Sequence, residues 1–153
     1  TGKILHFIHA DAFPPHNFTE SVCQAISVCQ AGCFRSLFDT KSKFLRLNSY
    51  FTRFSGTVFR GGGQTLFIQR DLFNLLGGYD ESLDLMEEYD LIQRIKKASK
   101  FKVIQQDVRV SARDYEKHGG LKLQSKYALV YFFFFSDFSK ETVKRVYLAL
   151  MGK

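Results

Sequence analysis

The chain has 153 residues, 45% of them hydrophobic, so it is long enough to bury a substantial core and too short to expect two domains. Its formal net charge is +7, and from residue 94 onward fourteen Lys and Arg accompany five Asp and Glu, which favours phosphate-bearing partners such as nucleotides, nucleic acid or anionic lipid head groups. The longest apolar run, nine residues at 127–135, is about half of what a membrane-spanning helix needs.

The first part of the chain alternates predicted strands and helices. Residues 3–8 are mostly apolar, with β-branched and aromatic side chains, which predicts a strand covered on both faces. A helix is expected from about residue 17 to residue 27, and a second strand at 31–38. Phe44, Leu47, Phe51 and Phe54 recur with helical spacing, so a second helix is predicted at 44–54.

The second part continues the alternation. Its predicted elements are a glycine-rich loop at 61–64, a buried strand at 65–69, a short helix, a turn at 77–80, a helix through 85–94, a strand at 101–104, a further segment at 108–112 that extends the same sheet, a flexible loop at 113–120, and helices at 121–134 and 139–150. This order predicts a single α/β domain over 1–153, with a helical tail at 121–151. With three or four strands and no glycine-rich nucleotide fingerprint, a doubly wound sheet would lack its first half.

One predicted helix carries a carboxylate on its apolar face. With a period of 3.6 residues, Glu88 falls on the same side as Leu91 and Ile95, whereas Glu87 lies beside that side. A partly buried carboxylate near the positive end of a helix dipole can be tuned as a general base. The alternative is that both acids simply complement the dipole in the first turn.

A second acid follows the first predicted strand. Asp11 stands at the carboxyl end of this strand, where ligands bind in open α/β sheets. Its carboxylate suits a hard divalent cation that substrate phosphates also hold, and His9 would flank the ligand. The alternative is an Asp that caps a turn.

Six short motifs occur in order between about residues 2 and 135. They are Phe7-Ile8-His9-Ala10-Asp11-Ala12, Ala31-Gly32-Cys33-Phe34-Arg35, Gly62-Gly63-Gln64-Thr65-Leu66-Phe67, Leu76-Gly77-Gly78-Tyr79, Leu85-Met86-Glu87-Glu88-Tyr89-Asp90-Leu91-Ile92-Gln93-Arg94 and Ser111-Ala112-Arg113. In order and spacing they resemble the family 2 glycosyltransferases, most closely a small bacterial subgroup. The resemblance implies the C-terminal part of a GT-A fold, which is the Rossmann-like fold of nucleotide-diphospho-sugar transferases, with a mixed sheet. The units that cradle the base and ribose of the donor would precede Thr1, which makes the chain an N-terminally truncated domain.

The resemblance also implies roles for the acids. The family's Asp-x-Asp-type motif binds the metal and the diphosphate of the donor, and it falls on His9-Ala10-Asp11. Asp11 would therefore hold Mg²⁺ or Mn²⁺, while His9 replaces the first acid and would contact the diphosphate. The family's catalytic base is the second member of an acidic pair at a helix start, which here is Glu88, with Glu87 on the acceptor side.

Other positions depart from the family pattern or lie in loops. The family's Gly-Asp-Gln appears as Gly62-Gly63-Gln64, so the acceptor side loses a carboxylate and keeps Gln64 to orient the acceptor. Arg113, with Lys117 and His118, lies on the predicted flexible loop and would close over the donor diphosphate. The alternative for these three residues is a solvated surface.

The reaction implied is a metal-assisted, inverting transfer of a sugar from a nucleotide-diphospho-sugar donor to an acceptor hydroxyl. The acceptor would be lipid-linked or a glycan. A different class is a catalytically inactive GT-A-like fragment that acts as a binding or interaction module. A nucleic-acid partner is not expected, because the basic residues are not interleaved with aromatics in a recognised pattern.

Cysteine spacing and the tail bear on location. Cys23, Cys29 and Cys33 match neither a zinc knuckle nor a redox pair, which predicts reduced thiols in a cytoplasmic protein, and no secretory signal begins the sequence. Residues 127–150 combine Phe-rich and Lys-bearing faces. These faces would contact the inner face of a membrane, pack on the core, or form the interface of a homo-oligomer.

Overall fold

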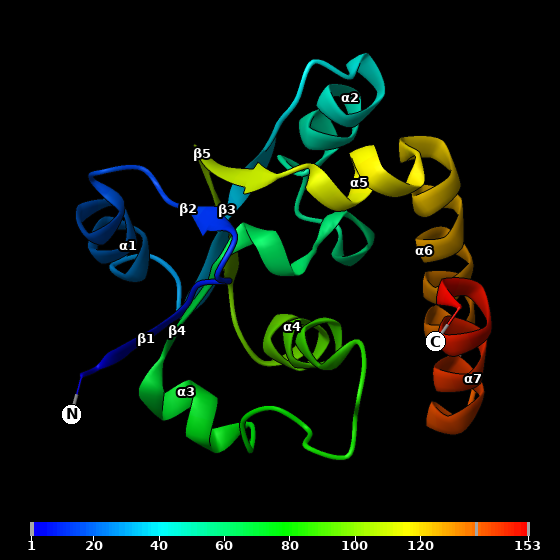
Figure 1. The fold of residues 1–153 in the computed structure, drawn as a ribbon. Coiled ribbons are helices and arrows are strands. Elements are labelled where there is room, and N and C mark those ends of the chain that lie inside the picture. The colour runs from blue at the N-terminus through cyan, green and yellow to red at the C-terminus, as the bar shows by residue number, and fades with distance from the viewer. Residues whose placement is uncertain (1, 137, 153) are drawn as a thin grey trace.

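A mixed five-stranded sheet runs through the computed structural model, which describes residues 2–136 and 138–152 (Figure 1). The strands are β1 (Ile4–Phe7), β2 (Ala12–Phe13), β3 (Ala31–Asp39), β4 (Leu66–Gln69) and β5 (Phe101–Ser111), in the sheet order β1-β4-β3-β5-β2. β3 and β5 are parallel, and the other neighbours are antiparallel. The predicted α/β class with a mixed sheet is confirmed.

Helices lie on both faces of this sheet and beside it. They are α1 (Phe18–Ile26), α2 (Lys43–Phe51), α3 (Arg70–Leu75), α4 (Glu87–Ala98), α5 (Arg113–His118), α6 (Gly120–Phe135) and α7 (Lys140–Met151), with 3₁₀ turns η1 (Thr57–Phe59) and η2 (Gly62–Gln64). In Figure 1, α1 lies on one side of the sheet, α3 and α4 lie on the other, and α6 and α7 run together at the edge of the molecule. The predicted C-terminal helices are thus present. Within the described residues, no helix combines the length and apolarity needed to cross a membrane.

Two apolar clusters cover the two faces of the central strands. On one face, Val22 of α1 packs with Phe67 and Val108, all of them buried. On the other face, Ile68 packs with Leu91 and other buried residues of α4. Neighbouring residues of β4 belong to opposite clusters because side chains alternate along a strand. The α4 surface that meets the sheet is therefore apolar.

The structure refines the predictions for two strands. β1 is covered on both faces, since Ile4 packs on one apolar cluster and Leu5 and Phe7 pack on the other, but it is an edge strand that pairs only with β4 and its residues are half-buried. Residues 101–104 and 108–112 do not form separate segments, because β5 runs from Phe101 to Ser111 with a register shift opposite Phe34 and Arg35. A bulge keeps one strand continuous although its partner is shorter there. β2, with two residues, is too short to leave a periodic pattern.

The predicted flexible loop at 113–120 is also wrong, since α5 occupies Arg113–His118. This stretch contains neither Gly nor Pro. Asp114 and Glu116 lie in its first turn and Lys117 and His118 in its last, so their charges complement the helix dipole. Gly119, with φ +83°, ends the helix.

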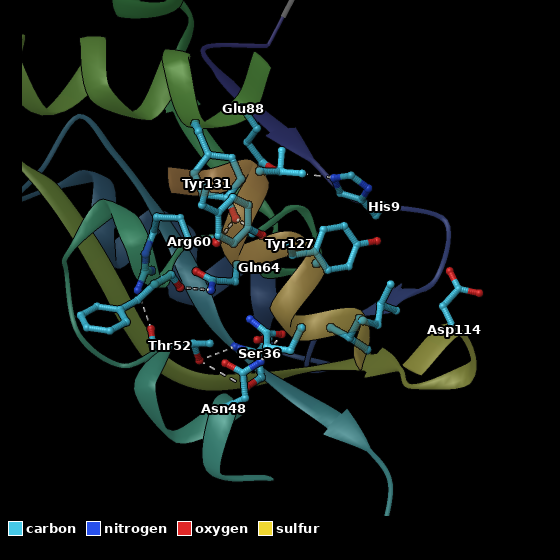
Figure 2. A pocket seen from close by; sticks show the side chains of 18 of the residues that line it. His9, Ser36, Asn48, Thr52, Arg60, Gln64, Glu88, Asp114, Tyr127 and Tyr131 are labelled. Carbon is cyan, nitrogen blue, oxygen red and sulfur yellow. Dashed lines mark hydrogen bonds and ion pairs between the residues drawn. The ribbon is translucent and has the colours of Figure 1, made fainter. Parts of the chain in front are cut away.

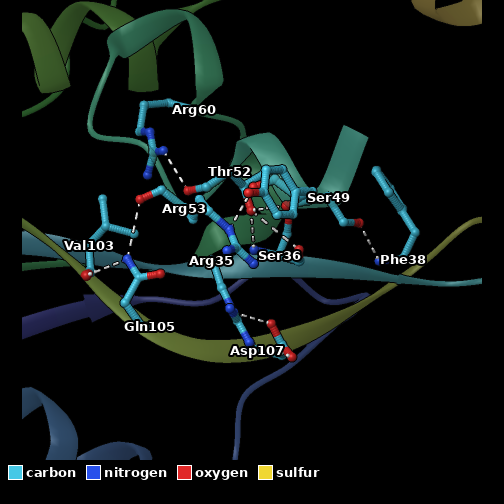
Figure 3. A network of polar contacts seen from close by, with 11 residues as sticks. Arg35, Ser36, Phe38, Ser49, Thr52, Arg53, Arg60, Val103, Gln105 and Asp107 are labelled. Atoms are coloured by element: carbon cyan, nitrogen blue, oxygen red, sulfur yellow. Dashed lines mark hydrogen bonds and ion pairs between the residues drawn. The ribbon is translucent and has the colours of Figure 1, made fainter. Parts of the chain in front are cut away.

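α2 packs on a sheet edge through hydroxyl groups. β4 pairs only with the first three residues of β3, which leaves the later N–H groups on that edge without a strand partner. The N–H of Ser36 donates to Thr52 Oγ1 at 3.0 Å, and the N–H of Phe38 donates to Ser49 Oγ at 3.0 Å (Figure 3). These bonds satisfy backbone donors that would otherwise be buried unpaired.

Two ion pairs link the segment between α3 and α4 to α7. Lys140 Nζ lies 2.7 Å from Asp80 Oδ2, and Lys144 Nζ lies 2.6 Å from Asp84 Oδ2. Hydrogen bonds from Lys140 and Ser82 lower the pKa of Asp80 to about 2, so this carboxyl is ionised at neutral pH. The C-terminal helix is thereby linked to the chain that enters α4.

Candidate functional site

A cavity of about 460 Å³ opens where α4, the glycine-rich turn, α2 and the α5–α6 unit meet. Figure 2 shows His9 and Glu88 facing each other on one side of it, with Tyr127 and Tyr131 of α6 alongside. The polar residues of its lining include His9, Asp11, Asn48, Gln64, Glu87, Glu88, Asp114 and Gln124. Five of the eight residues that the sequence proposed for a site are in this list.

Glu88 is held at the cavity by the start of α4. The chain enters this helix through Met86, whose left-handed backbone (φ +65°) turns the first helical residues toward the cavity. Leu91 and Ile95 are fully buried on the same face, and the Glu88 side chain is 13% exposed. The predicted helical phase is confirmed. A carboxylate in this position is partly desolvated and lies near the helix N-terminus, where the dipole favours negative charge.

His9 faces Glu88 from the segment that joins β1 and β2. Its Nε2 lies 3.8 Å from Glu88 Oε2. The interaction with the Glu88 carboxylate raises the pKa of His9, and the charges of Asp11 and Glu87 act in the same direction against partial burial. His9 therefore carries a proton, and a positive charge, to higher pH than an isolated histidine.

Asp11 reaches the same cavity from the residue before β2. Its side chain is exposed, and its backbone carbonyl accepts a hydrogen bond from the N–H of Ser111 at 3.3 Å. This backbone bond continues the pairing of β2 with β5, so the sheet fixes where Asp11 stands. Asp11 and Glu88 thus line one cavity from separate elements.

Gln64 lines the cavity but already makes contacts within the protein. Its Nε2 donates to the Phe59 carbonyl at 2.6 Å, and its Oε1 accepts from the Cys33 thiol at 3.4 Å. The side chain is 4% exposed. Gln64 therefore shapes the turn between η1 and β4, and an acceptor would meet only its second amide N–H.

Backbone strain follows directly after Gln64. Thr65 is fully buried, has φ +56°, and its Oγ1 has no hydrogen-bond partner. A left-handed backbone is costly for a β-branched residue, and such strain persists only where the surrounding structure imposes it. The turn that carries Gly63 and Gln64 is consequently held in a fixed shape.

A buried arginine stabilises the same wall. The Arg60 guanidinium is 4% exposed and donates to the Thr52 carbonyl at 2.7 Å, to the Phe54 carbonyl, and to Cys33 Sγ at 2.8 Å. Burial raises the pKa of the Cys33 thiol to about 11 although Arg60 opposes the shift, so this cysteine stays protonated. No pattern around Arg60 marks it as buried, because its partners are backbone carbonyls and one thiol that the fold brings together.

Arg113, Lys117 and His118 do not line the cavity. All three are exposed on α5, and His118 Nδ1 lies 3.0 Å from the Asp114 carbonyl oxygen. The helix turns Asp114 and Tyr115 toward the cavity instead. The arrangement thus separates the basic residues of α5 from the cavity that holds Asp11 and Glu88.

Sequence reasoning missed a wall of tyrosines. Tyr89 on α4 donates its hydroxyl proton to the Arg60 carbonyl, and its hydroxyl oxygen lies 2.9 Å from the Tyr131 hydroxyl. Tyr115, Tyr127 and Tyr147 complete this side of the cavity. Burial raises the pKa of Tyr89, Tyr115, Tyr127 and Tyr131, so these phenols remain protonated. Their sequence spacing carries no signal, since they come from four helices.

The side chains present offer a metal ion few donors of their own. Among residues 2–136 and 138–152, no three His, Cys, Asp or Glu side chains converge to hold an ion. Asp11 supplies one carboxylate, and Mg²⁺ is commonly bound by one or two carboxylates together with substrate phosphates and water. The donor set therefore fits an ion that arrives with a diphosphate.

Comparisons with known proteins add no family to this description. No protein-family model matches the chain, and comparisons with curated proteins and with solved structures give no match. The function is therefore argued from the cavity itself.

Proposed function

We propose that the chain carries the C-terminal part of a GT-A fold and transfers a sugar from a nucleotide-diphospho-sugar to an acceptor hydroxyl with inversion. The observation that carries the proposal is the shared cavity of Asp11 and Glu88, with His9 within 3.8 Å of Glu88. An inverting transfer needs a base on the acceptor side and positive charge at the leaving diphosphate. Glu88 and His9 supply these two features side by side.

Glu88 is the base in this proposal. It takes the proton from the acceptor hydroxyl as that oxygen attacks the anomeric carbon, and the bond from this carbon to the diphosphate oxygen breaks in the same displacement. Glu88 Oε2 faces His9, which leaves Oε1 for the hydroxyl. Partial burial at 13% exposure keeps water from competing for the carboxylate.

His9 and Asp11 serve the donor. Protonated His9 offers a charged hydrogen bond to a diphosphate oxygen, and its raised pKa extends to higher pH the range over which this charge is present. Asp11 would hold a divalent ion, Mg²⁺ or Mn²⁺, which when bound neutralises the leaving diphosphate. Arg113, Lys117 and His118 remain candidates for the diphosphate only if α5 moves toward the cavity.

The acceptor would lie against the tyrosine wall. Tyr127 and Tyr131 stack with 6.4 Å between ring centroids, and Glu87 and the second N–H of Gln64 border the same space. Aromatic rings with protonated hydroxyls suit a ligand that combines apolar faces with hydroxyl groups. This chemistry is compatible with a glycan or with the sugar of a lipid-linked acceptor.

Release of UDP or GDP from UDP- and GDP-sugars, with and without Mn²⁺, tests the proposal. Glu88→Gln should reduce turnover by roughly 10²-fold or more, because the amide accepts no proton. Glu20→Gln, an exposed first-turn acid on α1, is the matched control and should leave turnover unchanged. Asp11→Ala should remove the Mn²⁺-dependent part of donor affinity in calorimetry.

The competing class makes a different forecast for the same experiments. An inactive binding module would bind nucleotide sugar without turnover, and Glu88→Gln would not change that affinity. Turnover by the wild type that Glu88→Gln leaves intact would equally remove Glu88 from the mechanism.

A further inference from the structure

The exposed side of α2 is unusually apolar. Leu47, Tyr50, Phe51, Phe54 and Val58 are 40% to 58% exposed. We call these five side chains the α2 outer patch. The rings of Tyr50, Phe51 and Phe54 contact one another, so the centre of the patch is contiguous. Contiguous exposed apolar surface marks a site of interaction.

The contacts on the inner side of α2 explain why its apolar side chains are on the outer side. Ser49 and Thr52 face the edge of β3, where their hydroxyls accept backbone N–H groups. Because α2 meets the edge of the sheet and not one of its faces, its buried side holds Leu45 together with these hydroxyl groups, and most of its apolar residues lie elsewhere. Leu47, Phe51 and Phe54 recur at helical spacing on the opposite side, where they are exposed at the surface of the molecule.

The helix that carries the patch also carries basic side chains. Lys43, Arg46 and Arg53 belong to α2 and its C-terminal end, and no Asp or Glu occurs from Thr40 to Arg70. Arg53 lies over the ring of Tyr50, with its Cζ 3.8 Å from the ring centroid. No ion pair among the described residues involves these three cations. Their charge is thus free to act on an external partner.

The C-terminal helices offer a weaker surface of the same kind. Leu129 and Phe132 of α6 are also exposed. The nearby Lys140 and Lys144, however, are paired with Asp80 and Asp84. The membrane contact expected for residues 127–150 therefore has less unpaired positive charge than α2.

We propose that the α2 outer patch docks on the surface of an anionic lipid bilayer. Aromatic and Leu side chains enter the boundary between head groups and acyl chains, while Lys43, Arg46 and Arg53 meet lipid phosphates. A second copy of the chain is a poorer occupant, since it would bring two acid-free basic surfaces together. Figure 1 shows α2 at one end of the molecule, where it can approach a plane.

Docking by this patch would also place the cavity at the lipid surface. Phe51 and Val58 line the cavity as well as the patch. The acceptor class then follows as a lipid-linked hydroxyl that enters from the bilayer side. This assignment of the acceptor, unlike the docking, rests on the proposed function. The docking itself needs no donor, acceptor or catalysis.

Co-sedimentation with vesicles tests the docking. The wild-type chain should bind phosphatidylcholine vesicles that contain about 30% phosphatidylglycerol, and binding should fall with added NaCl because charges at the surface are screened. The triple variant Leu47→Ser, Tyr50→Ser and Phe54→Ser, none of which lines the cavity, should lower the partition coefficient about tenfold or more. The double variant Phe13→Ser and Leu75→Ser, at two exposed apolar positions elsewhere, should bind as the wild type does.

Several outcomes would overturn the docking. Equal binding of the triple variant and the wild type, or no binding by the wild type, rejects it. Sedimentation equilibrium that finds a dimer broken by the triple variant, without vesicle binding, assigns the patch to a second copy. Unchanged thermal melting of the variant excludes unfolding as the cause of lost binding. Vesicle binding by a chain without turnover rejects the glycosyltransferase alone, and turnover without vesicle binding rejects the docking alone.

Discussion

α2 and α4 both border the cavity, but they present opposite chemistry to the sheet. α4 lies on a sheet face and turns Leu91, Ile92 and Ile95 inward, whereas α2 lies on the edge of β3 and turns Ser49 and Thr52 inward. A sheet face offers apolar side chains, and an edge offers backbone donors that need acceptors. Whether a helix packs on a face or on an edge of the sheet therefore decides whether the inner side of the helix is apolar or polar.

The largest effect expected from this contrast is at the inner face of α4. Leu91→Ala should lower the free energy of unfolding by about 2–5 kcal/mol, because Leu91 is fully buried between α4 and β4 and truncation leaves a cavity. Leu47→Ala, the same substitution on the outer side of α2, should change it by less than about 0.5 kcal/mol. Urea unfolding followed by circular dichroism measures both, and similar losses for the two variants would contradict the contrast.

A smaller loss is expected at the inner face of α2. Thr52→Val keeps the shape of the side chain and removes the acceptor of the Ser36 N–H, which should cost about 1–3 kcal/mol of unfolding free energy. Ser55→Ala, at an exposed position just beyond α2, is the control and should have little effect. A Thr52→Val protein as stable as the wild type would mean that water or a shifted backbone satisfies the sheet edge.

The smallest effect concerns the charged pair at the start of α4. Since Glu88 raises the pKa of His9, Glu88→Gln should lower that pKa toward the usual histidine range in an NMR titration of the ring. The raised pKa adds stability that is fully present below about pH 6.5 and is lost as the pH rises through the folded value. The variant should show a flatter dependence of stability on pH across that window. An unchanged His9 pKa would mean that the two side chains do not interact.

Local periodicity predicted both helices, but it did not predict which side of α2 is buried. The 3.6-residue pattern located α4 and turned Glu88 inward, because a helix fixes the relative orientation of residues three and four positions apart. The same pattern predicted a helix near α2 from Phe44, Leu47, Phe51 and Phe54. Only Phe44 of these is half-buried, and the buried stripe is Leu45, Ser49 and Thr52. Periodicity identifies a helix without saying which side meets the core.

The rest of the candidate site depends on contacts that no local pattern encodes. The pairing of Tyr89 with Tyr131 joins residues 42 positions apart, and the buried Arg60 reaches Cys33 across 27 positions. Asp11 and Glu88 share a cavity because the sheet order places β2 at an edge beside β5, an order the sequence does not state. The sequence predicts a loop in place of α5 because Gly119 and Gly120, which follow it directly, are typical of flexible segments.

The two ion pairs of α7 connect the C-terminal helix to the segment that precedes Glu88 at the cavity. Asp80 and Asp84 precede Leu85, Met86 and Glu87, which form part of the cavity rim. Because both pairs are exposed, we expect high ionic strength to weaken them and so to weaken the attachment of the segment that precedes Glu88. Removal of α7 would act in the same way. α7 thus bears on the position of Glu88 through Asp80 and Asp84, in addition to contributing Tyr147 to the cavity lining.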